Sequence, residues 1–175
     1  MAAPFFTIGH SNRTVEEFVA LLSEADVMLV ADIRKIPRSR ANPQFNEDTL
    51  PGALEPFGIS YEHMPALGGL RRKARTTPRT VNGFWTNESF HNYADYALGA
   101  QFRAGIERLI DEGHARRCAI MCSEAVWWRC HRRIVADYLI AAGETVFHIM
   151  GAGHLDRAKL TVGAVIQSDR GIVYP

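Results

Sequence analysis

Short apolar runs alternate with segments of helical periodicity along most of the chain, and this alternation is the strongest constraint on the fold. The runs lack the apolar–polar alternation of half-exposed strands, so they predict strands buried on both faces. They span residues 5–10, 27–34, 59–64, 118–123 and 145–150. Because such strands separated by helices form parallel sheets, the sequence predicts an α/β domain with three layers. We expect a mostly parallel sheet of about five strands with helices on both faces.

The segments between these runs predict the helices. Thr14 and Glu17 form a capping box, the pattern in which a side chain at each end of the first turn satisfies a backbone amide. Apolar residues then recur at helical spacing. Further helices are expected from about Asn46, over 90–98 and 101–112, and from about Val126 onward.

Two segments show no such period. Residues 65–89 are rich in glycine, proline and basic residues, and irregular segments of this length are usually functional, so we expect a mobile lid over the site. The tail, residues 156–175, is expected to form a small hairpin that turns at Asp169–Gly171. No repeat or change of composition divides the chain, so a single domain over residues 1–175 is predicted.

The charge of the chain is small overall but unevenly distributed. The net charge of +1 argues against a generally basic nucleic-acid coat protein. From Arg34 to Arg79, however, nine lysines and arginines accompany only four acidic residues. This local excess predicts attraction of an anion, with a solvated loop surface as the alternative.

Cysteine content and apolar patterning indicate the compartment. Cys118, Cys122 and Cys130 are odd in number and clustered, unlike the disulfide framework of a small secreted domain. The first residues lack the features of an export signal, and no apolar run approaches the roughly 20 residues that a membrane span needs. We therefore expect a cytoplasmic protein with no membrane partner.

Polar residues stand at the end of every predicted strand. Ligands bind parallel sheets beyond the carboxyl ends of their strands, where these residues would meet. Buried polar groups cost free energy unless they are paired, so a purely structural role gains little from them. The pattern therefore indicates a ligand-binding or active site at this edge. The residues are His10, Asp32, Arg34, Glu62, His63, Cys122, Glu124 and His148.

Several stretches together resemble a known family. They are TIGHSNRTVEEFVALL, ADIRKIPRSRANPQFN, ISYEHMPALGG, CSEAVWWRCHRRIVADYL and VFHIM. In this order and spacing they are similar to the family called domain of unknown function 488, over about residues 6–155. The resemblance implies a fold and a site position but no reaction. The family's polar signature falls on His10, Ser11, Asp32, Arg34, Pro37, Arg38, Ser39, Pro43, Phe45, Cys122, Glu124, Cys130, His131 and Arg132.

The stretch 122–133 allows a metal site as one interpretation. Cys122, Cys130 and His131 are ligand types that suit zinc or iron. Seven residues separate the two cysteines, more than in zinc knuckles, and adjacent residues of a helix point about 100° apart. The sequence requires no cofactor, and a divalent metal is kept as an alternative.

A thiolate nucleophile is the second interpretation. Cys122 ends a predicted strand ahead of a helix, whose N-terminus lowers the pKa of a thiol. Six residues then separate Cys122 from Arg129, the loop has no glycine, and Glu124 would repel an anion. These features argue against a phosphatase-like or sulfurtransferase-like loop.

A hydrogen-bonded polar site is the third interpretation and needs the fewest geometric assumptions. Arginine forks bind phosphate or carboxylate oxygens, and histidines transfer protons near neutral pH. This interpretation predicts that Glu124 is paired with an arginine or a histidine of the site, with Arg132 as the first candidate. The catalytic candidates are His10, Asp32, Cys122, Glu124, His131 and His148. The substrate-binding candidates are Ser11, Arg34, Arg38, Ser39 and Arg132.

Aromatic residues near the arginines suggest the ligand class. A basic cleft lined by aromatic rings would hold a nucleotide or single-stranded nucleic acid. The chain has neither a dinucleotide fingerprint nor a phosphate-binding P-loop. We expect an enzyme acting on a nucleotide, a nucleic acid or another phosphorylated substrate. The alternative is a non-catalytic module that binds such a ligand, or a metal through Cys, His and Glu. The aromatic candidates are Phe45, Phe84, Trp85, Trp127 and Trp128.

Overall fold

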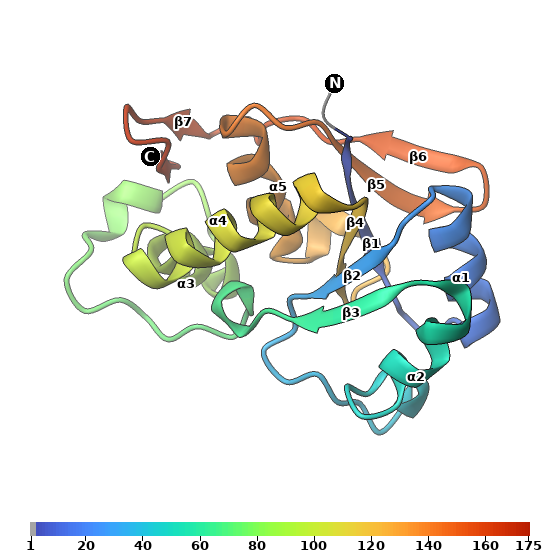
Figure 1. The fold of residues 1–175 in the computed structure, drawn as a ribbon. Coiled ribbons are helices and arrows are strands. Elements are labelled where there is room, and N and C mark those ends of the chain that lie inside the picture. Colours follow the sequence, from blue (N-terminus) through green and yellow to red (C-terminus); the bar gives the residue numbers. More distant parts are fainter. Residues whose placement is uncertain (1–2) are drawn as a thin grey trace.

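A twisted sheet forms the middle layer of the protein in a computed structural model that describes residues 3–175 (Figure 1). Its strand order is β3-β2-β4-β1-β5-β6, and all neighbours are parallel except β5 and β6. The predicted α/β fold is confirmed, with an antiparallel edge strand in addition. The strands are β1 (Phe5–Gly9), β2 (Leu29–Asp32), β3 (Ser60–His63), β4 (Cys118–Cys122), β5 (Val146–Gly151) and β6 (His154–Arg157).

Helices cover both faces of this sheet. On one face lie α1 (Val15–Glu24) and α2 (Leu50–Leu54), and on the other lie α3 (Glu88–Tyr96), α4 (Ala100–Ala115) and α5 (Arg132–Ala141) (Figure 1). Successive strand residues point to opposite faces, so Phe5 packs in one apolar cluster and Phe6 in the other. Burial on both faces explains why the strands are continuous apolar runs in the sequence.

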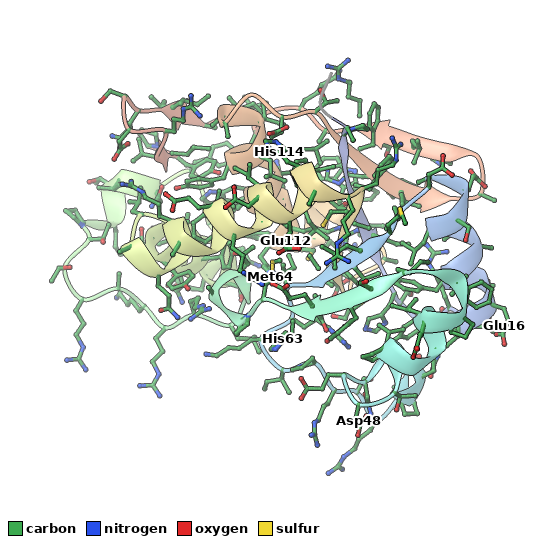
Figure 2. All side chains as sticks on the ribbon, in the orientation of Figure 1. Glu16, Asp48, His63, Met64, Glu112 and His114 are labelled. Atoms are coloured by element: carbon green, nitrogen blue, oxygen red, sulfur yellow. The ribbon has the colours of Figure 1, made fainter. Side chains whose placement is uncertain are left out.

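Side chains fill the space between the layers, while charged residues such as Glu16 and Asp48 point into solvent (Figure 2). The helix after Thr14 is confirmed with both hydrogen bonds of its capping box. The helices expected over 90–98 and 101–112 are confirmed as α3 and α4. The helix expected from Asn46 begins later, at Leu50.

The start expected for the helix at about Val126 is wrong. It begins at Arg132 instead, after a short 3-10 turn over Trp127–Arg129. Cys130 has an extended backbone, with φ −126° and ψ 145°. The apolar spacing of this segment is helical, but tertiary contacts of the Arg132 side chain hold the backbone before it in a different path.

The segment expected to be a lid is anchored at both ends. Leu67 lies in the 3-10 turn Pro65–Leu67, and Asn82 lies in the 3-10 turn Arg79–Asn82; both side chains are fully buried. Gly69 and Leu70 contribute to the wall of the main pocket. The segment therefore forms part of the site, while its mobility stays a prediction.

The tail hairpin is confirmed as β7 (Val165–Ile166) paired with β8 (Ile172–Val173). Tyr174 follows it and is fully buried. Its hydroxyl donates to Asp137 Oδ2 at 2.8 Å, and its backbone N–H donates to Asn82 Oδ1 at 2.9 Å. The tail thus belongs to the domain and fastens α5 to the segment before α3. Within residues 3–175, no helix has the length and apolar character required to cross a membrane.

The contact between α4 and β1 leads to a stability prediction. A Cβ atom at Gly113 would lie 2.1 Å from the Phe5 ring, whereas one at Gly52 would meet open space. Gly113→Ala should therefore lower the free energy of unfolding by about 2 kcal/mol, through overpacking. Gly52→Ala, the matched control, should be neutral or stabilise by up to about 1 kcal/mol, because alanine favours helix. Urea unfolding of both variants gives the comparison, and equal effects would contradict the packing seen here.

Candidate functional site

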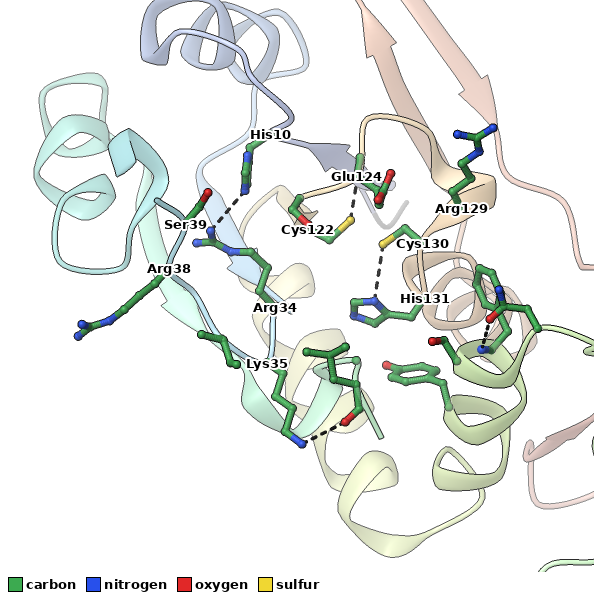
Figure 3. A pocket seen from close by; sticks show the side chains of 18 residues that line it. His10, Arg34, Lys35, Arg38, Ser39, Cys122, Glu124, Arg129, Cys130 and His131 are labelled. Atoms are coloured by element: carbon green, nitrogen blue, oxygen red, sulfur yellow. Dashed lines mark hydrogen bonds between the residues drawn. The ribbon is translucent and has the colours of Figure 1, made fainter. Parts of the chain in front are cut away.

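A pocket of about 460 Å³ lies at the carboxyl ends of β1, β2 and β4 (Figure 3). Its walls come from segments far apart in the sequence, including residues 34–39, 69–70 and 122–124. The predicted convergence of strand ends is therefore present for three neighbouring strands. The predicted site residues that line the pocket are His10, Arg34, Arg38, Ser39, Cys122, Glu124, Cys130 and His131.

Arg34 is held in place by Asp32 at the end of β2. Asp32 Oδ1 accepts from Arg34 Nε at 2.9 Å, and its Oδ2 accepts from Arg34 Nη2 at 2.7 Å. Asp32 Oδ2 also accepts from the Tyr61 hydroxyl at 2.5 Å. Asp32 is fully buried and does not line the pocket, so its contacts orient Arg34 rather than meet a ligand.

His10 lies against Arg34 at the inner wall. Its ring stacks on Phe45 with centroids 4.5 Å apart, and its Nδ1 lies 2.7 Å from the Ser11 carbonyl oxygen. Since a carbonyl only accepts, Nδ1 carries the proton, and Nε2 is left as an acceptor 3.3 Å from Arg34 Nη1. Burial lowers the pKa of His10, so the ring is neutral at pH 7.

His131 has the complementary arrangement on the opposite wall. Its Nε2 lies 2.9 Å from the Ile33 carbonyl oxygen and therefore donates to it. Its Nδ1 is then an acceptor, 3.7 Å from Cys130 Sγ (Figure 3). Burial lowers the pKa of His131, so this ring is also neutral at pH 7. Both histidines thus present one unprotonated nitrogen to the site.

Arg132 lies behind the pocket and is fully buried. Its Nη1 donates to the Glu124 carbonyl oxygen at 2.6 Å and to Cys122 Sγ at 2.7 Å, and its Nη2 donates to the Ala125 carbonyl oxygen at 3.3 Å. The predicted ion pair between Glu124 and Arg132 is wrong. Because the guanidinium binds the main chain of residue 124, the Glu124 carboxylate is free to point outward, and it is exposed at the pocket rim.

Cys122 and Cys130 lie at the floor of the pocket, and Figure 3 shows their sulfur atoms facing each other. Burial and the neighbouring Cys130 raise the pKa of Cys122 well above its ordinary value. Burial alone would also raise the pKa of Cys130, but the hydrogen bond with Cys122 and the charge of Arg132 outweigh it. The pKa of Cys130 is therefore lowered. The two thiols therefore differ in the direction of their pKa shifts.

His148 is not at the sheet edge, because β5 continues beyond it to Gly151. Its Nδ1 is 2.6 Å from Thr7 Oγ1, and its ring stacks on Trp127 at 4.7 Å. Burial, followed by the charge of Arg132, lowers the pKa of His148 to about 4. Because it does not line the pocket, its contacts serve the packing of residues 125–129 against the sheet.

The rim of the pocket is mainly basic. Lys35 donates from Nζ to the Leu70 carbonyl oxygen at 3.1 Å. Arg38 is 67% exposed and has only a long contact of 3.8 Å with Glu47. Arg129 extends into solvent on the side of the pocket opposite Arg38 (Figure 3).

The remaining sequence-based candidates lie elsewhere. Ser11 is not part of the pocket lining. The five aromatic residues expected in the cleft are also absent from its lining, whose rings belong to Phe90 and Tyr93. Phe45 and Trp85 are instead buried in the core. In the part of the chain that the structure describes, no group of three or more His, Cys, Asp or Glu side chains is arranged to hold a metal ion.

Several pocket residues were missed from the sequence. Lys35 and Arg129 adjoin predicted site residues, so a search of sequence neighbours would have found them. Asn87, the N-cap of α3, falls in the segment expected to lie over the site, whereas no local pattern indicates that Tyr93, within α3, reaches the pocket. The other missed residues are Ile36, Gly69, Leu70, Ser89, Phe90 and Ser123.

Comparison with known proteins identifies one relationship. The family model described as domain of unknown function DUF488 matches residues 14–139, a shorter span than the sequence motifs suggested. His10, Ser11 and His148 lie outside the matched span. No curated protein and no solved structure matches the chain.

The buried His148 leads to a prediction on pH. Its folded-state pKa of about 4 lies below the ordinary value of 6.5, so the unfolded chain binds more protons between these values. Stability from this group is fully present above pH 6.5 and is lost as the pH falls to 4, by about 3 kcal/mol. His148→Gln should remove this part of the pH dependence, whereas His154→Gln, at an exposed position, should not. Urea unfolding at pH 7 and pH 4 measures both, and parallel pH curves for wild type and His148→Gln would contradict the assignment.

The contacts of Arg132 lead to a second prediction. Arg132→Met should lower the free energy of unfolding by about 3 kcal/mol, because it leaves two main-chain carbonyls without their donor. Glu124→Gln should change it by less than about 1 kcal/mol, because the carboxylate is exposed. Thermal and urea melts of the two variants decide this. A larger loss of stability for Glu124→Gln than for Arg132→Met would instead support the ion pair that the sequence suggested.

Proposed function

Because the chain belongs to the family of domain of unknown function DUF488, whose description names no reaction, we propose a function from the site geometry. The protein is an enzyme that binds a small anionic substrate in the pocket at the carboxyl edge of its sheet. The observation that carries the proposal is the convergence of two neutral histidines and two thiols under a basic rim.

Anion binding is supported by the balance of charge around the pocket. The lining contains the cations Arg34, Lys35, Arg38 and Arg129 against the single carboxylate of Glu124. Asp32 offsets the charge of Arg34 but fixes its guanidinium so that Nη1 lies beside His10. The rim side chains are long and exposed, so they can fold over a bound anion. Guanidinium groups suit phosphate and carboxylate oxygens in such a site.

Acid–base chemistry is supported by the protonation of the histidines. His10 Nε2 and His131 Nδ1 are unprotonated, and each ring is oriented through its other nitrogen by a main-chain carbonyl. A neutral imidazole held in one tautomer can accept a proton from a bound substrate or from a nearby thiol. Glu124 at the rim is the remaining acid–base candidate.

A small molecule is favoured over a nucleic-acid strand. The pocket volume of about 460 Å³ is within the range of small-ligand sites. The aromatic residues that would have stacked on successive bases do not line the pocket. The substrate is therefore a compact anion such as a phosphorylated or carboxylated metabolite.

Calorimetric titration with inorganic pyrophosphate tests anion binding. Arg38→Gln and Arg129→Gln should each weaken binding by about 3- to 10-fold, since each removes a charge-assisted contact. Arg72→Gln is the matched control, because Arg72 is exposed and does not line the pocket. Binding should also raise the pKa of His10 in an NMR titration, because a nearby anion favours the imidazolium. Equal weakening by all three variants, or an unshifted His10, would contradict binding in this pocket.

A further inference from the structure

We propose that Cys130 and Cys122 form a reversible dithiol/disulfide pair that reacts with a small anionic disulfide. In this pair Cys130 is the attacking thiolate and Cys122 is the resolving thiol. The substrate class rests on the proposed function, because the disulfide enters the same basic pocket. The dithiol chemistry itself rests on a separate set of contacts.

The first of these is the charge of Arg132. Its guanidinium is fully buried, and within residues 3–175 no carboxylate lies within ion-pair distance of it. Its Nε also has no hydrogen-bond partner. A buried cation without a counter-charge is costly. The groups beside it that can become anionic are the thiols of Cys122 and Cys130, so a thiolate on this pair stabilises the buried charge.

The second is the position of Cys130, two residues before the first residue of α5, a helix of ten residues. The Arg132 backbone N–H donates to Cys130 Sγ at 3.4 Å, so the sulfur accepts a hydrogen bond at the positive end of the helix. His131 Nδ1 lies 3.7 Å from the same sulfur and is an acceptor, because Nε2 donates to Ile33. A thiol beside an oriented base and a helix N-terminus is an activated nucleophile.

The third is the placement of Cys122. It ends β4, lines the same pocket, and points its sulfur at that of Cys130 (Figure 3). Its raised pKa keeps it as a thiol, which donates to the Glu124 carbonyl oxygen at 3.9 Å. Cys118 provides the contrast within the same strand. It is buried away from the pocket, and burial raises its pKa to about 12.

The reaction consists of two thiol–disulfide exchanges. The Cys130 thiolate attacks one sulfur of R–S–S–R, a Cys130–S–S–R bond forms, and RS⁻ leaves. The Cys122 thiol then loses its proton to the released RS⁻, and its sulfur attacks Cys130 Sγ. The Cys122–Cys130 disulfide forms and the second RS⁻ leaves, taking a proton from solvent. The protein loses two electrons and the Cys122 proton, and with one proton from solvent R–S–S–R becomes two RSH.

Trapping and mass spectrometry test the assignment on the full chain. Reduced protein is incubated with oxidised glutathione, which is anionic, or with bis(2-hydroxyethyl) disulfide, which is neutral. Samples are quenched by alkylation and mapped as peptides. Each rate is divided by the rate of the same reagent with free N-acetylcysteine, which corrects for intrinsic reactivity. Wild type should yield a peptide linked through Cys122 and Cys130, and the corrected rate should be at least about tenfold higher for the anionic reagent.

Variants separate the two roles. Cys122→Ser should accumulate the mixed disulfide on Cys130, whereas Cys130→Ser should react at least about tenfold more slowly. Serine keeps an acceptor for the Arg132 contacts at either position, and thermal melts verify the fold. Cys118→Ser is the control and should behave like wild type. In wild type, brief alkylation at pH 7 should label Cys130 before Cys122, a measurement that needs no variant.

The outcomes distinguish this inference from the proposed function. Absence of the linked peptide with both reagents, or labelling of Cys122 before Cys130, overturns the dithiol pair, while pyrophosphate binding still reports on the pocket. Equal corrected rates for the two reagents overturn the anionic disulfide as the substrate class. Adducts on Cys118 at a comparable rate would show that the reactivity comes from unfolding.

Discussion

The buried guanidinium of Arg132 is the constraint on which the site depends. It binds the carbonyl oxygens of residues 124 and 125 and the sulfur of Cys122, and thereby determines the path of the chain between β4 and α5. The same path carries Cys130 to the floor of the pocket and leaves the Glu124 side chain outside. A shorter side chain, or one without these N–H donors, could not bind all of these acceptors. Arg132, the first residue of α5, therefore determines the conformation of the loop and the positions of the Glu124 carboxylate and the two thiols.

Burial fixes the protonation of the two histidines that line the pocket. His10 and His131 are neutral because burial disfavours the imidazolium, and carbonyl acceptors select opposite tautomers in the two rings. Asp32 and Tyr61 orient Arg34 in a comparable way. Such fixed orientations reduce the reorganisation that a reaction would otherwise require. On the exposed rim, Arg38 has a long contact of 3.8 Å with Glu47 and is much less restrained than Arg34.

Sequence reasoning succeeded where a local pattern determines the outcome. The capping box at Thr14 and the hairpin turn at Asp169–Gly171 are both short-range features, and both are present. It failed for Cys130, whose helical spacing was overridden by contacts of Arg132, and for His148, which lies inside β5 rather than at its end. Strand ends are set by pairing with neighbours, so the last residue of an apolar run need not be the last residue of the strand.

By itself, the sequence determined a sheet buried on both faces and a set of polar residues at its carboxyl edge. Strands that are continuous apolar runs require cover on both faces, which the intervening helices supply, and parallel strands bring their ends together. Only the tertiary structure decided which of those residues share the pocket and what each one contacts. The Glu124 side chain and the Glu124 carbonyl compete for the same Arg132, and sequence spacing is equal for both. Packing of the intervening backbone against β1 and β5, together with the Arg132 hydrogen bonds, places the carbonyl at the guanidinium.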